Sequence, residues 1–196
     1  MNTHYCLPAN GGEGIARALA NARPGDQVLL APGRYLLSRP LEVTTGVVLR
    51  GQHTRLRTPD SRSSAEMLAT AGQLAPEFDH PDTAVLVGNG FIDPIVNVVG
   101  DQVCLAGLAL LAEAVSGAQS GDAMLSAIDV QGTRILACRF GGGGQYCSAV
   151  ELIRCCNPTV SDCAVSDLDP IDRPGRAAVV LKSVTHAGNG RSSRSV

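Results

Sequence analysis

The sequence predicts an all-β chain whose short strands stack into a solenoid: a right-handed parallel β-helix with a short N-terminal helix. Three observations favour this fold class. Of 196 residues, 22 are glycine, 3 % are aromatic and 17 % are charged. Small aliphatic residues must therefore fill the core, and many tight turns interrupt the strands. Short strands recur in pairs separated by Gly, Asn or Asp, and equivalent positions return at nearly regular intervals, from Leu108 to Cys138 and on to Cys163. Intervals of this length indicate stacked repeats.

The first part of the chain predicts a helix followed by short strands. Ile15, Ala18, Leu19 and Ala22 are spaced to share one helical face, which predicts a cap helix over residues 14–22. Pro24 and Gly25 then end it. The strand segments that follow are 27–31, 35–37, 41–43 and 47–51.

Three apolar columns are expected to run through the stacked repeats, because each unit alone cannot bury its apolar side. The first column consists of Leu105, Ile135 and Val160. The second consists of Leu108, Cys138 and Cys163, and the third of Leu110, Phe140 and Val165.

The segments between these strands are expected to be variable loops, which in solenoids often project from a binding face. They are residues 58–83, 112–126, 141–148 and 166–176. A doubly wound α/β sheet is the alternative architecture, but after Ala22 there is little room for crossover helices. Residues 108–115 are the one rival helical segment.

The seven cysteines include no Cys-x-x-Cys pair, so a zinc knuckle or a redox dithiol motif is not expected. Cys104, Cys138 and Cys163 fit the core as small hydrophobic residues. Cys147, Cys155 and Cys156 lie nearer turn residues and are better disulfide candidates.

Charge and hydropathy exclude two classes of partner. The net charge of −2 gives no electrostatic basis for recruiting nucleic acid. No window has the length of apolar sequence that a membrane helix needs. Residues 1–12 lack the basic and apolar regions of a signal peptide, so the protein stays in the cytoplasm or its export signal is outside this chain.

The run from Gly14 to Tyr35, with its Pro-Gly-Asp turn at 24–26, and the strands 41–43 and 47–51 resemble the N-terminal region of pectin-lyase-like β-helices, the pectate-lyase superfamily. The resemblance implies that the helix plugs one end of the solenoid. It also implies an extracellular setting and a substrate class of long, often acidic, carbohydrate polymers laid along a strand face. The same fold carries lyases, hydrolases and modules without catalysis, so activity has to be argued from a site.

One segment concentrates charged side chains that suit such chemistry. Paired carboxylates could hydrolyse a glycosidic bond or bind Ca²⁺, and an arginine could clamp a sugar carboxylate. The candidate catalytic residues are Asp162, Asp167, Asp169, Asp172, Arg173 and Arg176. The alternative is a polar surface turn, since Asp-Pro and Pro-Gly are ordinary turn sequences.

Two functions follow from these observations. The first is a lyase or hydrolase that acts on an acidic polysaccharide; the second is a non-catalytic β-helix module for glycan binding or surface structure. We expect residues 1–196 to form a single domain with a disordered tail at 187–196. Because no C-terminal cap is evident, we expect that end to be covered by another subunit or by a part missing from this chain. The alternative is that the tail, or the loop 58–83, folds back over the end.

Overall fold

The computed structural model describes residues 1–52, 76–89, 91–113, 121–142, 146–166 and 177–185. These residues form sixteen strands, one short 3₁₀-helix (η1, Pro8–Asn10) and one α-helix (α1, Gly11–Asn21). The strands are β1 (Thr3–Cys6), β2 (Gln27–Leu30), β3 (Gly33–Leu36), β4 (Leu41–Val43), β5 (Val48–Gly51), β6 (Ala84–Asn89), β7 (Val96–Val98), β8 (Cys104–Ala106), β9 (Leu108–Glu113), β10 (Gly121–Ile128), β11 (Arg134–Leu136), β12 (Arg139–Gly141), β13 (Tyr146–Ile153), β14 (Thr159–Ser161), β15 (Ala164–Ser166) and β16 (Ala177–Lys182).

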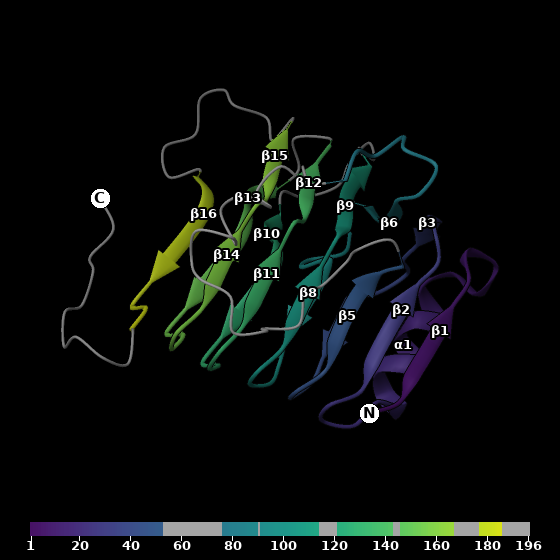
Figure 1. Ribbon diagram of the computed structural model, residues 1–196. Helices are drawn as coiled ribbons and strands as arrows, with labels where there is room; N and C mark the ends of the chain where they lie inside the picture. The colour runs from purple at the N-terminus through teal and green to yellow at the C-terminus, as the bar shows by residue number, and fades with distance from the viewer. Residues whose placement is uncertain (53–75, 90, 114–120, 143–145, 167–176, 186–196) are drawn as a thin grey trace, which may run out of the picture.

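The strands form three parallel sheets, which the chain visits in a fixed order. Sheet A has the order β1-β2-β5-β8-β11-β14, sheet B the order β3-β6-β9-β12-β15, and sheet C the order β4-β7-β10-β13-β16. From β2 onward the described chain passes through A, B and C five times, adding one strand to each sheet in each circuit. Figure 1 shows the strands of sheet A side by side at the front, from β1 at the N-terminal end to β14.

The three predicted columns are confirmed by the strand register. In sheet A, Leu105 pairs with Ile135, and Ile135 pairs with Val160. In sheet B, Phe140 lies between Leu110 and Val165. The members of the second column, Leu108, Cys138 and Cys163, each immediately precede a paired residue of sheet B. All nine side chains belong to, or pack against, one hydrophobic cluster, so the interior is a continuous apolar core.

Helix α1 covers the N-terminal end of this core, as its amphipathic pattern predicts. It begins at Gly11, three residues before the predicted start, and buries Gly12, Ile15 and Leu19. It contacts β1, β2, β3 and β4, which belong to all three sheets. In Figure 1 it lies behind β1 and β2, at the same end of the molecule as the N-terminus. The helix therefore shields the first turn of the core from solvent.

Several elements differ from the sequence-based expectation. Strands β1 and β6 have no predicted counterpart. Strand β10 begins at Gly121, inside the segment 112–126 predicted to be a loop. Small and polar residues at its start hide its period-2 pattern. The rival helix at 108–115 is wrong where the structure describes it, because residues 108–113 form β9.

The cysteines do not form disulfides in this structure. The prediction that Cys104 and Cys138 are core residues is confirmed, and Cys163 is half-buried beside them. Cys155, predicted as a disulfide candidate, is instead a buried member of the core whose Sγ–H donates to the carbonyl of Ala127. Residues flanking a turn can thus point inward when the turn is a corner of the coil.

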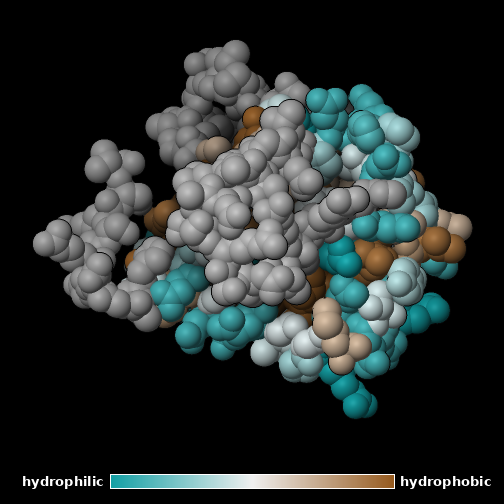
Figure 2. Space-filling model, viewed as in Figure 1, coloured by the Kyte–Doolittle hydropathy of each residue, from teal (hydrophilic) through white to brown (hydrophobic). Residues whose placement is uncertain are grey.

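The exposed surface carries few large apolar side chains. Met1, Tyr5, Leu7 and Leu36 are exposed around the end formed by β1 and β3. In Figure 2 hydrophobic atoms appear at that end, on the right, among hydrophilic ones. Within the described residues, the single α-helix is too short to cross a membrane.

Candidate functional site

Asp162, the described member of the predicted charged cluster, lies at the corner between β14 and β15. Its side chain is exposed and its backbone has a φ of 56°. The hydroxyl of Ser161 donates a hydrogen bond to its Oδ2 at 2.6 Å. The equivalent corners of the two preceding circuits hold Gly107 and Ala137, also at positive φ. Asp162 thus has a local backbone role, because Asp adopts this left-handed conformation more readily than most residues.

The other five candidates fall outside the described residues, so the expected convergence of carboxylates stays a prediction. They are Asp167, Asp169, Asp172, Arg173 and Arg176. Among the described residues, no three His, Cys, Asp or Glu side chains gather closely enough to hold a metal ion. Calcium binding by the segment around Asp162 stays a prediction.

The structure reveals a different candidate, a row of polar side chains on the outer face of sheet C. Glu42, Asn97, Ser126 and Glu151 pair in register along β4, β7, β10 and β13. On each strand the two neighbours of the polar residue are buried core residues. Because successive side chains on a strand point to opposite faces, the polar row faces outward. Neighbouring members are separated by the strand spacing of about 4.8 Å.

An apolar row runs beside the polar row, two positions further along each strand. It consists of Val99, Ile128 and Ile153, which follow β7 or end β10 and β13. Val99 is 47 % exposed and Ile128 is 43 % exposed, which is unusual for large aliphatic side chains. The outer face of sheet C therefore presents hydrogen-bonding groups and aliphatic surface in parallel, along the stacking direction.

Lys182 ends the apolar row on β16 and joins it to the polar row. Its Nζ donates a hydrogen bond to Glu151 Oε1 at 2.6 Å. This contact raises the pKa of Lys182, so the lysine stays charged over the neutral range. Glu151 is the more shielded partner, with 13 % of its side chain exposed, whereas Lys182 is 59 % exposed. The ammonium group of Lys182 is thus held beside Glu151 while it remains exposed to solvent.

A hollow of about 300 Å³ lies at the N-terminal end of the polar row, between α1 and β4. It shares Glu42 with the row and adds Arg39 and Thr44 over an apolar base on the helix. The guanidinium of Arg39 donates to both carboxylate oxygens of Glu13, at 3.0 and 3.3 Å. That pair holds Arg39 at the rim and also lowers the pKa of Glu13.

The outer faces of the other two sheets are covered in part. On sheet B, Phe78 and Leu111 pack over Val85, Val87 and Ala109. On sheet A, Leu29, Cys104 and Ala106 alternate with core positions and are buried, whereas Arg134 and Thr159 are exposed. On sheet C, Glu42 is exposed and Asn97 and Glu151 are partly exposed, whereas Ser126 between them is buried at 8 %.

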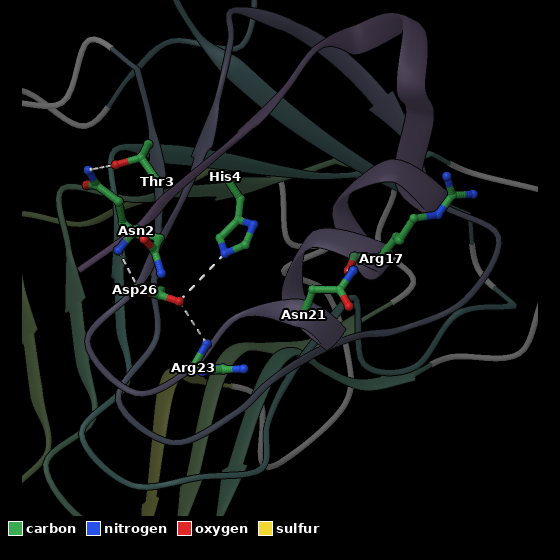
Figure 3. A network of polar contacts seen from close by, with 8 residues as sticks. Asn2, Thr3, His4, Arg17, Asn21, Arg23 and Asp26 are labelled. Carbon is green, nitrogen blue, oxygen red and sulfur yellow. Dashed lines mark hydrogen bonds and ion pairs between the residues drawn. The ribbon is translucent and has the colours of Figure 1, made fainter.

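A polar network fixes the turn that starts the first circuit (Figure 3). The carboxylate of Asp26 accepts hydrogen bonds from the backbone N–H groups of Asn2, at 2.6 Å, and Arg23, at 3.1 Å. These bonds lower the pKa of Asp26 to about 2. His4 Nε2 lies 3.7 Å from the same carboxylate. Through these hydrogen bonds Asp26 links the start of β1 to the residues that follow α1, which gives the Pro-Gly-Asp turn a structural role.

The polar row was not predicted from sequence, although a signal for it exists. Each member stands between two apolar residues, as in Leu41-Glu-Val43 and Val96-Asn-Val98. That alternation marks an outward position on a half-buried strand. It does not show that four such positions align, because alignment depends on the lengths of the intervening loops.

No protein-family model matches the chain, and no curated protein matches it by sequence. Among solved structures, the chain is similar to a protein from Parabacteroides merdae ATCC 43184 described as a putative glycosyl hydrolase. The identity is 13 %, the TM-score is 0.40, and the match covers 97 % of this chain and 99 % of that one.

Proposed function

We propose that the chain is a right-handed parallel β-helix of the pectin-lyase-like kind, and that it binds a polysaccharide along the outer face of sheet C. The repeated passage through three parallel sheets supports the architecture. Parallel strands joined by crossovers are right-handed in nearly all known cases, which supports the handedness.

The observation that carries the binding proposal is the polar row with its apolar neighbour. A linear polysaccharide presents hydroxyl groups and apolar C–H faces at regular intervals. Glu42 and Asn97 lie on adjacent strands, and Glu151 lies two strands beyond Asn97, with the buried Ser126 between them. Carboxylates and amides accept hydrogen bonds from hydroxyls, and the aliphatic row supplies apolar contact. Lys182 and Arg39 add cations at the two ends, which suit an acidic glycan.

The catalytic form of this proposal is a lyase or hydrolase that uses Asp162 with the carboxylates and arginines of residues 167–176. Calcium could bridge those carboxylates to an acidic sugar. The non-catalytic form is a glycan-binding or surface module. One observation favours it: Asp162 already accepts a hydrogen bond within its own corner.

Binding is tested by calorimetry with a panel of neutral and uronic-acid polysaccharides, each with and without Ca²⁺. Glu151→Ala and Asn97→Ala should each weaken binding by about tenfold or more, because each removes a hydrogen-bonding group from the row. Thr159→Ala, on the exposed outer face of sheet A, is the matched control and should bind like the parent chain. Equal affinities for all four proteins would refute a site on sheet C.

Catalysis is tested on the same polymers by following unsaturated products for a lyase and new reducing ends for a hydrolase. Replacing Asp162 and Asp169 together with Ala should abolish either signal while the melting transition is retained. Full activity in the double variant excludes that site. Binding without product in the parent chain supports the non-catalytic module.

A further inference from the structure

Two cysteines of adjacent circuits are stacked on one another inside the coil. Cys138 precedes β12 and Cys163 precedes β15, and the residues that follow them, Arg139 and Ala164, pair in register. The backbone N–H of Ala164 donates to the carbonyl of Cys138 at 2.9 Å, which holds the two corners together. Both side chains belong to or pack against the core cluster.

The stacking geometry suits a covalent bond between the two sulfurs. Neighbouring parallel strands lie about 4.8 Å apart, and disulfides span Cα separations of about 4.4–6.8 Å. Each Sγ–H lies against the carbonyl two residues before it: Cys138 against Leu136 at 3.4 Å and Cys163 against Ser161 at 3.3 Å. The two side chains therefore share one orientation, and Cys163 Sγ also lies 3.6 Å from the carbonyl oxygen of Ile135, in the circuit that holds Cys138.

We propose that Cys138 and Cys163 form a modification site, at which a low-molecular-weight disulfide oxidises the stacked thiols to an intramolecular disulfide. The Cys163 thiolate attacks one sulfur of the reagent, forms a mixed disulfide and releases one thiolate. The Cys138 thiolate then attacks Sγ of Cys163 and releases the second. Two protein thiols and one disulfide reagent give one protein disulfide and two reagent thiols, so electrons and protons balance.

Cys163 and Cys138 differ in burial and in thiol pKa, as the proposed order of attack requires. Cys163 is half-buried and lies between β14 and β15, the last strands in the order of sheets A and B. The hydrogen bond from Cys138 lowers the pKa of the Cys163 thiol, which favours its thiolate as the first nucleophile. Cys138 is buried, and its bond to Cys163 together with burial raises its pKa. Cys138 is thus the resolving thiol.

The bond would close one circuit of the coil into a covalent ring. The ring runs from Cys138 through β12, β13 and β14 to Cys163. It would fasten the fifth described circuit to the fourth, at a point where Val160 and Val165 are only half-buried. Reduction would release that circuit again. The proposal does not depend on glycan binding, because neither sulfur lies on sheet C.

The test treats the native, fully reduced chain with oxidised glutathione, quenches it in acid, alkylates the remaining thiols and digests it with trypsin. Cys147→Ser and Cys156→Ser are included in the starting protein to remove competing half-exposed and exposed thiols. Without reduction, the expected product is peptide 135–139 joined to peptide 155–176, with fragment ions placing the bond at Cys163 rather than Cys155. Dithiothreitol should separate the two peptides, and the oxidised chain should melt at a higher temperature.

Matched variants separate the two steps. Cys138→Ala should stop the reaction with glutathione on Cys163, and Cys163→Ala should leave Cys138 unmodified for the duration of the native reaction. The peptide mapping needs neither of these variants, so it decides the outcome even if one of them fails to fold. Recovery of both cysteines only in alkylated form would overturn the proposal. A bond that forms only after unfolding in urea, or one to Cys155, would overturn it equally.

Discussion

Individual corner residues set the geometry of this coil. Seven described residues other than glycine have positive φ, a conformation that most side chains avoid. They recur at equivalent corners: Asp129, Arg154 and Ser183 follow β10, β13 and β16. Five of the seven donate a backbone N–H to the next circuit, as from Asp129 to Ile153 and from Arg154 to Lys182. The corner hydrogen bonds hold the backbone in a conformation that its side chains do not favour.

Ala137 is a corner residue whose side chain cannot form a hydrogen bond that would offset the strain of a positive φ. Its φ is 48°. Ala137→Gly should raise the free energy of unfolding by about 1 kcal/mol, since glycine removes the left-handed strain. Ala149→Gly, at a buried position within β13, should lower it by about 1 kcal/mol. Urea unfolding of both variants measures the difference, and the same sign for both would contradict the corner argument.

Asp26 should give the chain an acid-sensitive contribution to stability. Its pKa of about 2 lies below the ordinary 3.8 because of backbone hydrogen bonds from Asn2 and Arg23. A carboxyl group whose pKa is lower in the folded state stabilises that state at pH values above its pKa in the unfolded chain. That contribution is lost as the pH falls from about 4 through about 2. Asp26→Asn should flatten the stability curve in this window, as measured by urea unfolding at each pH. Glu77→Gln, which removes an exposed carboxylate, is the control; a change of slope as large in the control would contradict this role.

At the scale of elements, sheet B is covered by the segment that precedes β6. Phe78 packs with Leu111 over three buried residues of β6 and β9. The guanidinium of Arg139 lies 5.8 Å from the centre of the Phe78 ring, and its Nε donates to the carbonyl of Pro76 at 2.6 Å. The segment is thus fastened to sheet B by apolar packing, a cation–π contact and a hydrogen bond.

Phe78→Ala should lower the free energy of unfolding by about 1–2 kcal/mol, because a half-buried ring loses its apolar contact and its interaction with Arg139. Phe78→Leu keeps most of the apolar area and should lose less. Thermal and urea unfolding measure both variants. Faster proteolysis near Pro76 in the alanine variant would show that the cover has loosened, and unchanged stability in both would contradict its docking on sheet B.

The repeated elements were predictable from sequence because their apolar residues recur at constant offsets. The step from Ile135 to Val160 equals the step from Phe140 to Val165, and the sequence alone aligned both pairs. β1 escaped prediction because its sequence, Thr3-His-Tyr-Cys6, has no apolar alternation. Its place in sheet A follows instead from backbone pairing with β2. Such short strands leave too little pattern to identify one at a time.

The candidate site was less predictable than the fold. The density of charge between Asp162 and Arg176 drew attention to one loop, and Asp162 proved to be a corner residue. The polar row on sheet C comes from four segments that are far apart in the sequence, the first at Glu42 and the last at Glu151. Aligning them requires the register of the whole stack, which depends on how the intervening loops close and not on local residue pattern.

For the whole molecule, the decisive property is that neighbouring circuits share one register. Between the fourth and fifth described circuits, the offset in sequence is the same in sheet A, from Ile135 to Val160, as in sheet B, from Phe140 to Val165. In sheet C the offset is larger, as from Ser148 to Ala177, because the loop between sheets B and C is longer. Each circuit therefore contributes the same set of inward positions, whatever its loops contain. This is the behaviour of a stacked repeat, in which contacts are made mainly between neighbours.

Removal of residues 134–158 tests that behaviour directly. Joining Thr133 to Thr159 places Val160 against Leu105 and Val165 against Leu110, in the positions that Ile135 and Phe140 occupy in the parent. We expect the shortened chain to fold cooperatively, with lower stability and a smaller denaturant m-value, because less surface is exposed on unfolding. Circular dichroism and urea unfolding measure both quantities.

A deletion that also removes Thr159 is the control that distinguishes register from mere length. Removing residues 134–159 moves Val160 to the outward position of Arg134 and turns the following apolar residues away from the core, because strand side chains alternate between faces. This variant should unfold at much lower urea or fail to fold, although it differs from the first by a single threonine. If both deletions were equally stable, the circuits would not be held by their columns, and the stacked-repeat architecture would have to be abandoned.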